Sequence, residues 1–239
     1  MNVIAIVQAR MGSTRFPGKI LEIVRDKTIL EHIITCLRNC QNIKEIVVAT
    51  TTLKEDDRTV EICKKIGCRY FRGSASDVLG RFYDCATQCN ADVIVRLTAD
   101  NLLLDSDIID KLIEFSNEDY DYISNVLDHA FPLGFSSCEI FRYSVLEKLH
   151  QTKKDSKSRE HVTPFIRENP GLFKIKNYNI HEYKDRSEWR LTIDYKEDLI
   201  LVKKIFNAIA DINSCVKFER LIKFLDENKE LLDSNKKVN

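Results

Sequence analysis

The sequence has no excess of charge of either sign, since 37 lysines and arginines stand against 37 aspartates and glutamates. A long nucleic-acid groove or a polybasic membrane face usually leaves a surplus of cations. Long apolar runs are also missing. The run at residues 3–7 is too short for a signal peptide or a transmembrane helix and reads as a buried strand. We therefore expect a cytoplasmic protein with no nucleic-acid partner and no membrane partner.

The cysteine spacings of common metal sites are absent too. The chain has eight cysteines but no Cys-x-x-Cys and no Cys–His cluster with zinc-finger spacing. Cys36 and Cys40, and likewise Cys85 and Cys89, lie four residues apart on predicted helices, so each pair shares a face and could supply two ligands to a metal. Since free cysteines are usually buried and no secretory signal is visible, we expect buried, reduced thiols.

Glycine and proline are scarce, with seven and four residues among 239, and they form no low-complexity linker. Apolar residues make up 44% and charged residues 31% of the chain, which is typical of a globular protein. This length is enough to bury a sizeable core without metal or disulfide staples. We expect one domain over residues 1–239.

Strands and helices alternate in the first half. Apolar patterns predict strands at 3–9, 45–50, 69–71 and 92–97, and helices at 28–40, 55–66, 77–89 and 106–115. This alternation predicts βαβ units and a mostly parallel sheet, whose ligands lie beyond the carboxyl ends of the strands. The loops at those ends are 8–19, 50–53, 72–77 and 98–105.

The second half is less regular. We expect strands at 120–124, 138–141, 173–180 and 190–193, and helices at 143–151, 159–169, 196–210 and 217–232. Pro164 would kink the helix at 159–169 or mark a new start. The remaining segments are an irregular stretch at 128–137, a polar loop at 152–158 and a frayed tail at 234–239.

The strongest local signal is the loop that follows the first strand, QARMGSTRFPGK at residues 8–19. Two glycines permit a close backbone approach, and Arg10, Arg15 and Lys19 would neutralise a polyphosphate. The loop is neither a Walker loop nor the GxGxxG pattern of dinucleotide sites. It therefore predicts an anion site of another kind, with a solvated basic loop as the alternative.

This loop resembles the signature of the cytidylyltransferase family that includes CMP-sialic acid synthetases, CMP-KDO synthetases and SpsF-type spore-coat polysaccharide proteins. The SpsF-like loop reads much like QARMGSTRLPGK, so only Phe16 departs. Residues 72–81, 96–100, 159–165 and 190–199 extend the resemblance in family order. It implies an α/β, Rossmann-like three-layer nucleotidyltransferase fold, with a mostly parallel sheet and a small appended lobe in the second half. It also implies acceptor-side and dimerisation elements at about 125–190, and a homodimer.

By resemblance, Asp100 and Asp194 are ligands of Mg²⁺, and Arg10, Lys19, Asp100 and Asp194 are the catalytic residues. Each aspartate also has a structural alternative. Asp100 could cap the turn before the next helix, although Asp105 suits that role better. Asp194 fits a capping box as the N-cap, with Glu197 as its partner.

The resemblance further implies two binding regions. The nucleotide-binding candidates are Gln8, Ala9, Arg10, Gly12, Ser13, Arg15, Lys19, Ser74, Asp77 and Arg81. The acceptor-binding candidates are Glu139, Arg159, His161 and Arg190. Asp77 and Arg81 could instead form an ion pair one helical turn apart, and His161 could be an ordinary packed or surface residue.

The implied reaction transfers CMP from CTP to a sugar acid, sugar phosphate or phosphonate and releases pyrophosphate, in polysaccharide or glycoconjugate biosynthesis. The chain departs from the SpsF-like pattern at Ala99, at Asn101-Leu102 in place of Cys-Pro, and around Ser136-Ser137. These departures bear on the identity of the acceptor more than on nucleotide transfer. The alternatives are a glycosyltransferase that uses a nucleotide sugar and a catalytically silent nucleotide-binding protein.

Overall fold

A computed structural model describes residues 1–127, 131–178 and 185–233. Within these residues seven strands form one sheet in the order β5-β4-β1-β6-β8-β7-β9. Only β8 runs antiparallel to its neighbours, so the predicted mostly parallel sheet is confirmed. The strands are β1 (Val3–Gln8), β4 (Glu45–Thr51), β5 (Arg69–Gly73), β6 (Val93–Thr98), β7 (Tyr122–Ser124), β8 (Glu139–Arg142) and β9 (Ile175–Asn177).

Helices cover both faces of the sheet. Successive side chains of β1 point to opposite faces, so Val3 and Val7 join one buried cluster and Ile4 and Ile6 join the other. The first cluster includes residues of α1 (Ile29–Leu37), α2 (Asp57–Lys65) and α4 (Ser106–Glu114). The second includes residues of α3 (Val78–Gln88) and α5 (Tyr143–Thr152). The result is the predicted three-layer arrangement.

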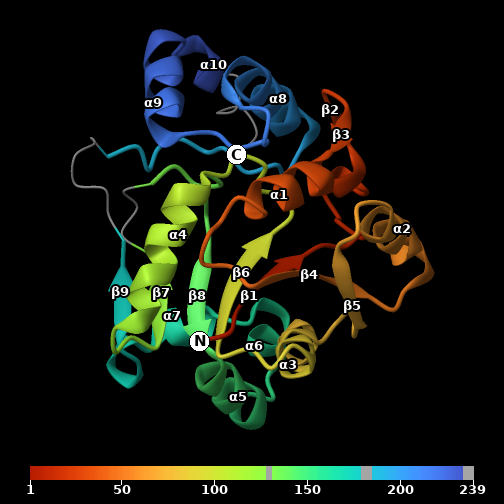
Figure 1. The fold of residues 1–239 in the computed structure, drawn as a ribbon, viewed down its shortest axis with the longest axis vertical. Coiled ribbons are helices and arrows are strands. Elements are labelled where there is room, and N and C mark those ends of the chain that lie inside the picture. The colour runs from red at the N-terminus through yellow and green to blue at the C-terminus, as the bar shows by residue number, and fades with distance from the viewer. Residues whose placement is uncertain (128–130, 179–184, 234–239) are drawn as a thin grey trace.

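The last helices gather at one end of the molecule, opposite α3, α5 and α6 (Figure 1). They are α8 (Lys196–Ile209), α9 (Phe218–Glu227) and α10 (Glu230–Asp233). The single helix predicted at 217–232 is wrong. Asn228 interrupts it, and its side chain donates to the Phe224 carbonyl at 2.8 Å, which satisfies the last turn of α9. No helix among the described residues is both long and apolar enough to span a membrane.

The structure also decides, corrects or completes several local predictions. Residues 159–169 form two helices, α6 (Ser156–His161) and α7 (Pro164–Glu168), because Val162 adopts a φ of 68° and Pro164 starts α7, so the alternative of a new start at Pro164 is confirmed. The loop predicted at 152–158 ends early, since Asp155 caps α6. The strand at 190–193 is reduced to one bridge between Arg190 and Leu133. A hairpin of β2 (Ile23–Val24) and β3 (Lys27–Thr28) was not predicted.

Parts of three predicted segments lie outside the described residues. These are positions 128–130, positions 179–180 and the tail at 234–239.

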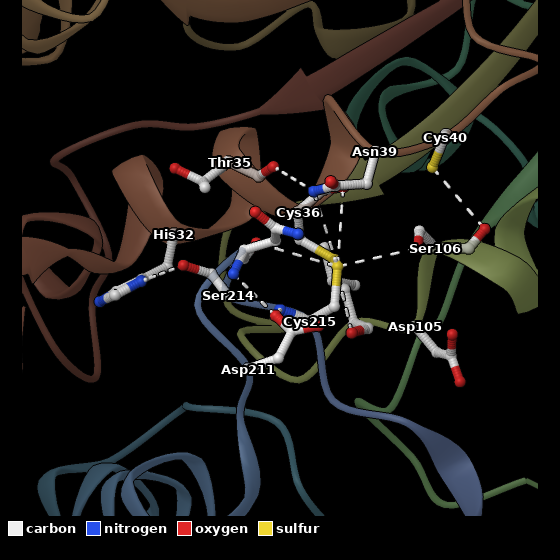
Figure 2. The surroundings of a disulfide bond; sticks show 12 residues. His32, Thr35, Cys36, Asn39, Cys40, Asp105, Ser106, Asp211, Ser214 and Cys215 are labelled. Atoms are coloured by element: carbon white, nitrogen blue, oxygen red, sulfur yellow. Dashed lines mark hydrogen bonds between the residues drawn. A yellow bond between two sulfur atoms is a disulfide. The ribbon is translucent and has the colours of Figure 1, made fainter.

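A disulfide joins Cys36 of α1 to Cys215 in the segment before α9 (Figure 2), with 5.1 Å between their Cα atoms. The expectation of reduced thiols is therefore wrong for this pair and right for the six free cysteines. The two cysteines meet because the connection between α8 and α9 packs against α1. Ser214 Oγ lies 2.8 Å from His32 Nδ1 in the same contact (Figure 2). The spacing of the cysteines in the sequence does not predict this contact.

We expect the Cys36–Cys215 disulfide to stabilise the fold by about 2–4 kcal/mol, because it closes a long loop in the unfolded chain. Urea unfolding with and without a thiol reductant measures this contribution. Reductant should lower the stability of the wild-type protein and leave that of Cys215→Ser unchanged. Eight titratable thiols in the unfolded, unreduced wild-type protein would contradict the prediction.

Candidate active site

The loop at residues 8–19 leaves β1 at the carboxyl edge of the sheet. Asp56, which is fully buried, holds its first part: its Oδ1 accepts from Met11 N at 2.6 Å, and its Oδ2 accepts from Thr51 Oγ1. Phe16 is buried beneath the loop, and Gly18 closes it with a φ of 74° and a bond from its N–H to the Met11 carbonyl at 3.0 Å. The shape of the loop is thus supported by the protein itself.

Lys19 ends this loop and brings two distant carboxylates together. Its Nζ donates to the Ile193 carbonyl at 2.6 Å and lies 3.2 Å from Asp100 Oδ2 and 3.5 Å from Asp194 Oδ1. The backbone supports the same contact, since Ile193 N donates to the Asp100 carbonyl at 2.9 Å. The two predicted metal ligands therefore both lie next to the Lys19 ammonium group.

Asp194 does not cap α8. Tyr195 is the N-cap, and Asp198 at the third helical position accepts through Oδ2 from Asp194 N at 2.7 Å and from Tyr195 N at 2.8 Å. The capping box predicted for Asp194 and Glu197 is therefore wrong by one residue. The Asp194 carboxylate instead lies between Arg15 Nη2 at 2.6 Å and Arg190 Nη2 at 2.9 Å.

Asp100 does not cap α4 either. Asp105 is the N-cap, and its side chain accepts from Asp107 N at 3.1 Å and from Phe218 N at 3.0 Å. The expectation that Asp105 suits this role better is confirmed. Asp100 is left at the carboxyl end of β6, where its side chain faces Lys19.

A pocket of about 200 Å³, here called the loop pocket, lies between these groups. Three carboxylates around it, Asp100, Asp194 and Asp198, are matched by Arg15, Lys19 and Arg190. The charges of these six groups cancel, and Arg10 adds one positive charge. This is less than the charge of a triphosphate, so a bound polyphosphate would need further positive charge. The pocket is lined by Gln8, Arg10, Ser13, Thr14, Arg15, Lys19, Ile20, Thr98, Ala99, Asp100 and Asp194.

The donor set fits magnesium. No group of three or more potential ligands gathers within the described parts of the chain. Mg²⁺ needs only one or two carboxylates, because it keeps several waters and takes phosphate oxygens from the substrate. Asp100 and Asp194 could hold such an ion once a polyphosphate is present.

Known proteins resemble this chain over nearly its whole length. The cytidylyltransferase family model matches residues 4–238. The SpsF spore coat polysaccharide biosynthesis protein of Bacillus subtilis is 32% identical, with 95% of each chain covered. The chain belongs to the cytidylyltransferase family.

Two further relatives extend the likeness over the whole chain. An uncharacterised protein of Methanocaldococcus jannaschii is 41% identical, with 100% of this chain and 96% of that protein covered. The solved structure of a cytidylyltransferase from Leptospira borgpetersenii is 36% identical and superimposes with a TM-score of 0.91 over 97% of each chain.

Five other nucleotide candidates of this cytidylyltransferase are not part of the lining of the loop pocket. Ala9 and Gly12 belong to the loop but do not line the pocket, and neither do Ser74, Asp77 and Arg81. Their role in nucleotide binding stays a prediction.

Arg81 lies beneath the turn at 73–77. Its side chain is 1% exposed and donates to the Ser74 carbonyl, and burial lowers its pKa to about 10. Asp77 caps α3 by accepting from Gly80 N at 2.8 Å, and it pairs with Arg159. The alternative ion pair between Asp77 and Arg81 is therefore wrong. Any contribution of Arg81 to nucleotide binding would act through the Ser74 turn.

The four acceptor candidates are not brought together. Arg190 pairs with Asp194 and Asp198, Arg159 pairs with Asp77, and His161 is exposed at the end of α6. Glu139 is buried in another place, beside Arg96.

Asp56 and Asp198 were missed from the sequence. The sequence does contain a pattern for Asp198, because an acidic residue three positions after an N-cap is typical of a helix start. Using that pattern requires the first residue of the helix to be known exactly. No sequence pattern indicates the role of Asp56, since its hydrogen-bond partners come from the loop at residues 8–19 and from β4.

We expect Asp56→Asn to lower the free energy of unfolding by about 1–3 kcal/mol and to raise the KM for the nucleotide, because the amide cannot accept from both of its donors. Asp57→Asn is the matched control. Asp57 is half exposed and pairs with Arg72, so its loss should cost about 1 kcal/mol or less. Urea unfolding and initial rates measure both effects, and equal effects of the two substitutions would count against the role of Asp56.

Proposed function

We propose that this protein transfers CMP from CTP to an oxygen of a sugar-type acceptor and releases pyrophosphate. The observation that carries the proposal is the approach of Asp100 and Asp194 to the same Lys19 ammonium, beside a basic loop with two glycines. The family supports cytidylyl transfer. The relative that is named for spore coat polysaccharide biosynthesis supports a sugar-type acceptor.

The chemical difficulty is charge, because the acceptor oxygen must approach the α-phosphorus of a highly anionic triphosphate. Positioning and charge neutralisation therefore supply most of the rate. In this proposal Arg10, Arg15 and Lys19 bind the phosphates and stabilise the leaving pyrophosphate. The oxygen–phosphorus bond to the acceptor forms as the bond between the α- and β-phosphates breaks, so no covalent enzyme intermediate is needed.

Asp100 and Asp194 would hold Mg²⁺ in this proposal. When bound, the ion polarises phosphate oxygens and lowers the pKa of the acceptor oxygen. Before the nucleotide arrives, Lys19 and Arg15 balance the same carboxylates.

We expect Asp100→Asn and Asp194→Asn each to lower kcat by at least about 100-fold, since each removes charge that stabilises only the reacting complex. The assay is pyrophosphate release from CTP with a panel of sugar acids, sugar phosphates and phosphonates. Asp105→Asn is the control. It removes the ion pair with Lys217 and one acceptor of the backbone N–H groups of Asp107 and Phe218, away from the loop pocket, so it should lower thermal stability and leave the rate per folded molecule nearly unchanged.

A rate retained by the Asp100 and Asp194 variants would contradict the assignment. Release of nucleotide from a nucleotide sugar, without pyrophosphate, would show a glycosyltransferase instead. Binding of CTP without turnover of any acceptor in the panel would favour a catalytically silent nucleotide-binding protein.

We also expect the affinities for Mg²⁺ and CTP to be linked. Cations of the protein already neutralise Asp194, so Mg²⁺ alone should bind weakly, and CTP should tighten it at least about tenfold. Isothermal titration with and without CTP measures this effect. Arg15→Gln removes one competing cation and should tighten binding of Mg²⁺ alone. Equal affinity for Mg²⁺ with and without CTP would refute the linkage.

A further inference from the structure

A second pocket, here called the side pocket, lies next to the loop pocket at the same edge of the sheet. It encloses about 130 Å³, several times the share of one water molecule in the liquid, so it has room for one end of a sugar. Thr98, the last residue of β6, lines both pockets. Asp100 lines the loop pocket and Asn101 lines the side pocket. A ligand in the side pocket would therefore lie close to the proposed reaction centre.

Asn101 presents an unused polar atom in this region. The residue is only 7% exposed, and its Nδ2 donates to Thr98 Oγ1 at 3.0 Å. Its Oδ1 is buried and has no hydrogen-bond partner among the described residues. A buried polar atom without a partner is costly, so native proteins usually satisfy it. This atom is closed to solvent, so a ligand hydroxyl would reach it only after the Asn101 side chain rotates toward the side pocket. The hydroxyl could then pair with either amide atom, because a hydroxyl both donates and accepts.

The buried ion pair of the side pocket is already balanced. Arg96 and Glu139 face each other on β6 and β8 and form an ion pair, and Tyr122 and Thr163 also donate to Glu139. Burial by itself raises the pKa of Glu139, but Arg96 and these hydrogen bonds outweigh it and lower that pKa below its usual value. Glu139 therefore stays ionised, and its charge and that of Arg96 cancel.

Arg167 adds a positive charge that this pair does not cancel. It lies on α7, lines the side pocket, and has no ion pair within the residues that the structure describes. The neighbouring Glu168 is engaged by Lys157 at 2.6 Å. The side pocket consequently combines one net positive charge with one unused amide atom.

We propose that the side pocket binds the far end of the acceptor, and that Arg167 and Asn101 determine its specificity. Arg167 binds an anionic group, a carboxylate or a phosphate, and Asn101 binds a hydroxyl group. The inference rests on the proposed function, because it takes the loop pocket as the site of CTP. Cysteine stands at position 101 in the SpsF-like pattern and would not make the same hydrogen bonds, so the acceptor selected here should differ from that of an SpsF-like protein.

Small fragments test the side pocket directly. Dissociation constants of glycerol, glycerate and glycerol 3-phosphate are measured by saturation-transfer NMR, with CTP and Mg²⁺ present to fill the loop pocket. We expect at least one of the anionic fragments to bind about tenfold more tightly than glycerol, and the tighter one identifies the anionic group. Arg167→Gln should abolish the preference, Arg167→Lys should keep part of it, and the control Glu168→Gln should leave it unchanged.

The hydroxyl is tested separately by comparing glycerate with propionate, which has the same charge and no hydroxyl groups. The wild-type protein should prefer glycerate, and Asn101→Cys should reduce that preference about fivefold. This substitution introduces the residue of the SpsF-like pattern, and thermal unfolding of the variant checks that the fold is retained.

A failure of the side-pocket proposal can be distinguished from a failure of the proposed function. If CTP binds but no anionic fragment is preferred, or if Arg167→Gln keeps the preference, the side pocket is not the acceptor site and CMP transfer still stands. If CTP itself does not bind to the wild-type protein, the proposed function fails, and this inference fails with it.

Discussion

The contact of the Lys19 ammonium with Asp100 and Asp194 is the interaction on which the site depends. These residues come from the first loop, the end of β6 and the segment before α8. Lys19 is buried, and its Nζ also donates to the Ile193 carbonyl. The ammonium therefore connects the segment before α8 to the loop that follows β1. The same contact stabilises the fold and brings two carboxylates to the edge of the sheet where ligands bind.

The charges around this contact explain why the site suits a metal–nucleotide complex. Each carboxylate is balanced by a side chain of the protein, so neither a free metal ion nor a free triphosphate is strongly favoured. A divalent cation offsets half of the charge of a fully ionised triphosphate, and Arg10 offsets part of the rest. The protein can therefore keep two aspartates close together without a bound ion, which would otherwise be costly through like-charge repulsion.

Much of this arrangement could be predicted from the sequence. Alternating strands and helices up to residue 115 predicted the parallel sheet, and the loops after the strands contained Lys19 and Asp100. The pairing of Asp100 with Asp194 came from the family resemblance, because no spacing rule connects residues from different halves of a chain. Errors arose where tertiary contacts decide. The disulfide depends on how the α8–α9 connection packs against α1. The capping residues of α8 can be identified only if the first residue of the helix is known exactly. The side pocket has no local sequence pattern, since its lining comes from β6, β8, α7 and the loops between them.

The most direct test of the central claim is a crystal structure with CTP and Mn²⁺, in which anomalous scattering locates the ion. The account predicts one Mn²⁺ bonded to a carboxylate oxygen of Asp100, to one of Asp194 and to the α-phosphate. An ion that contacts neither carboxylate, or CTP bound away from residues 8–19, would contradict it.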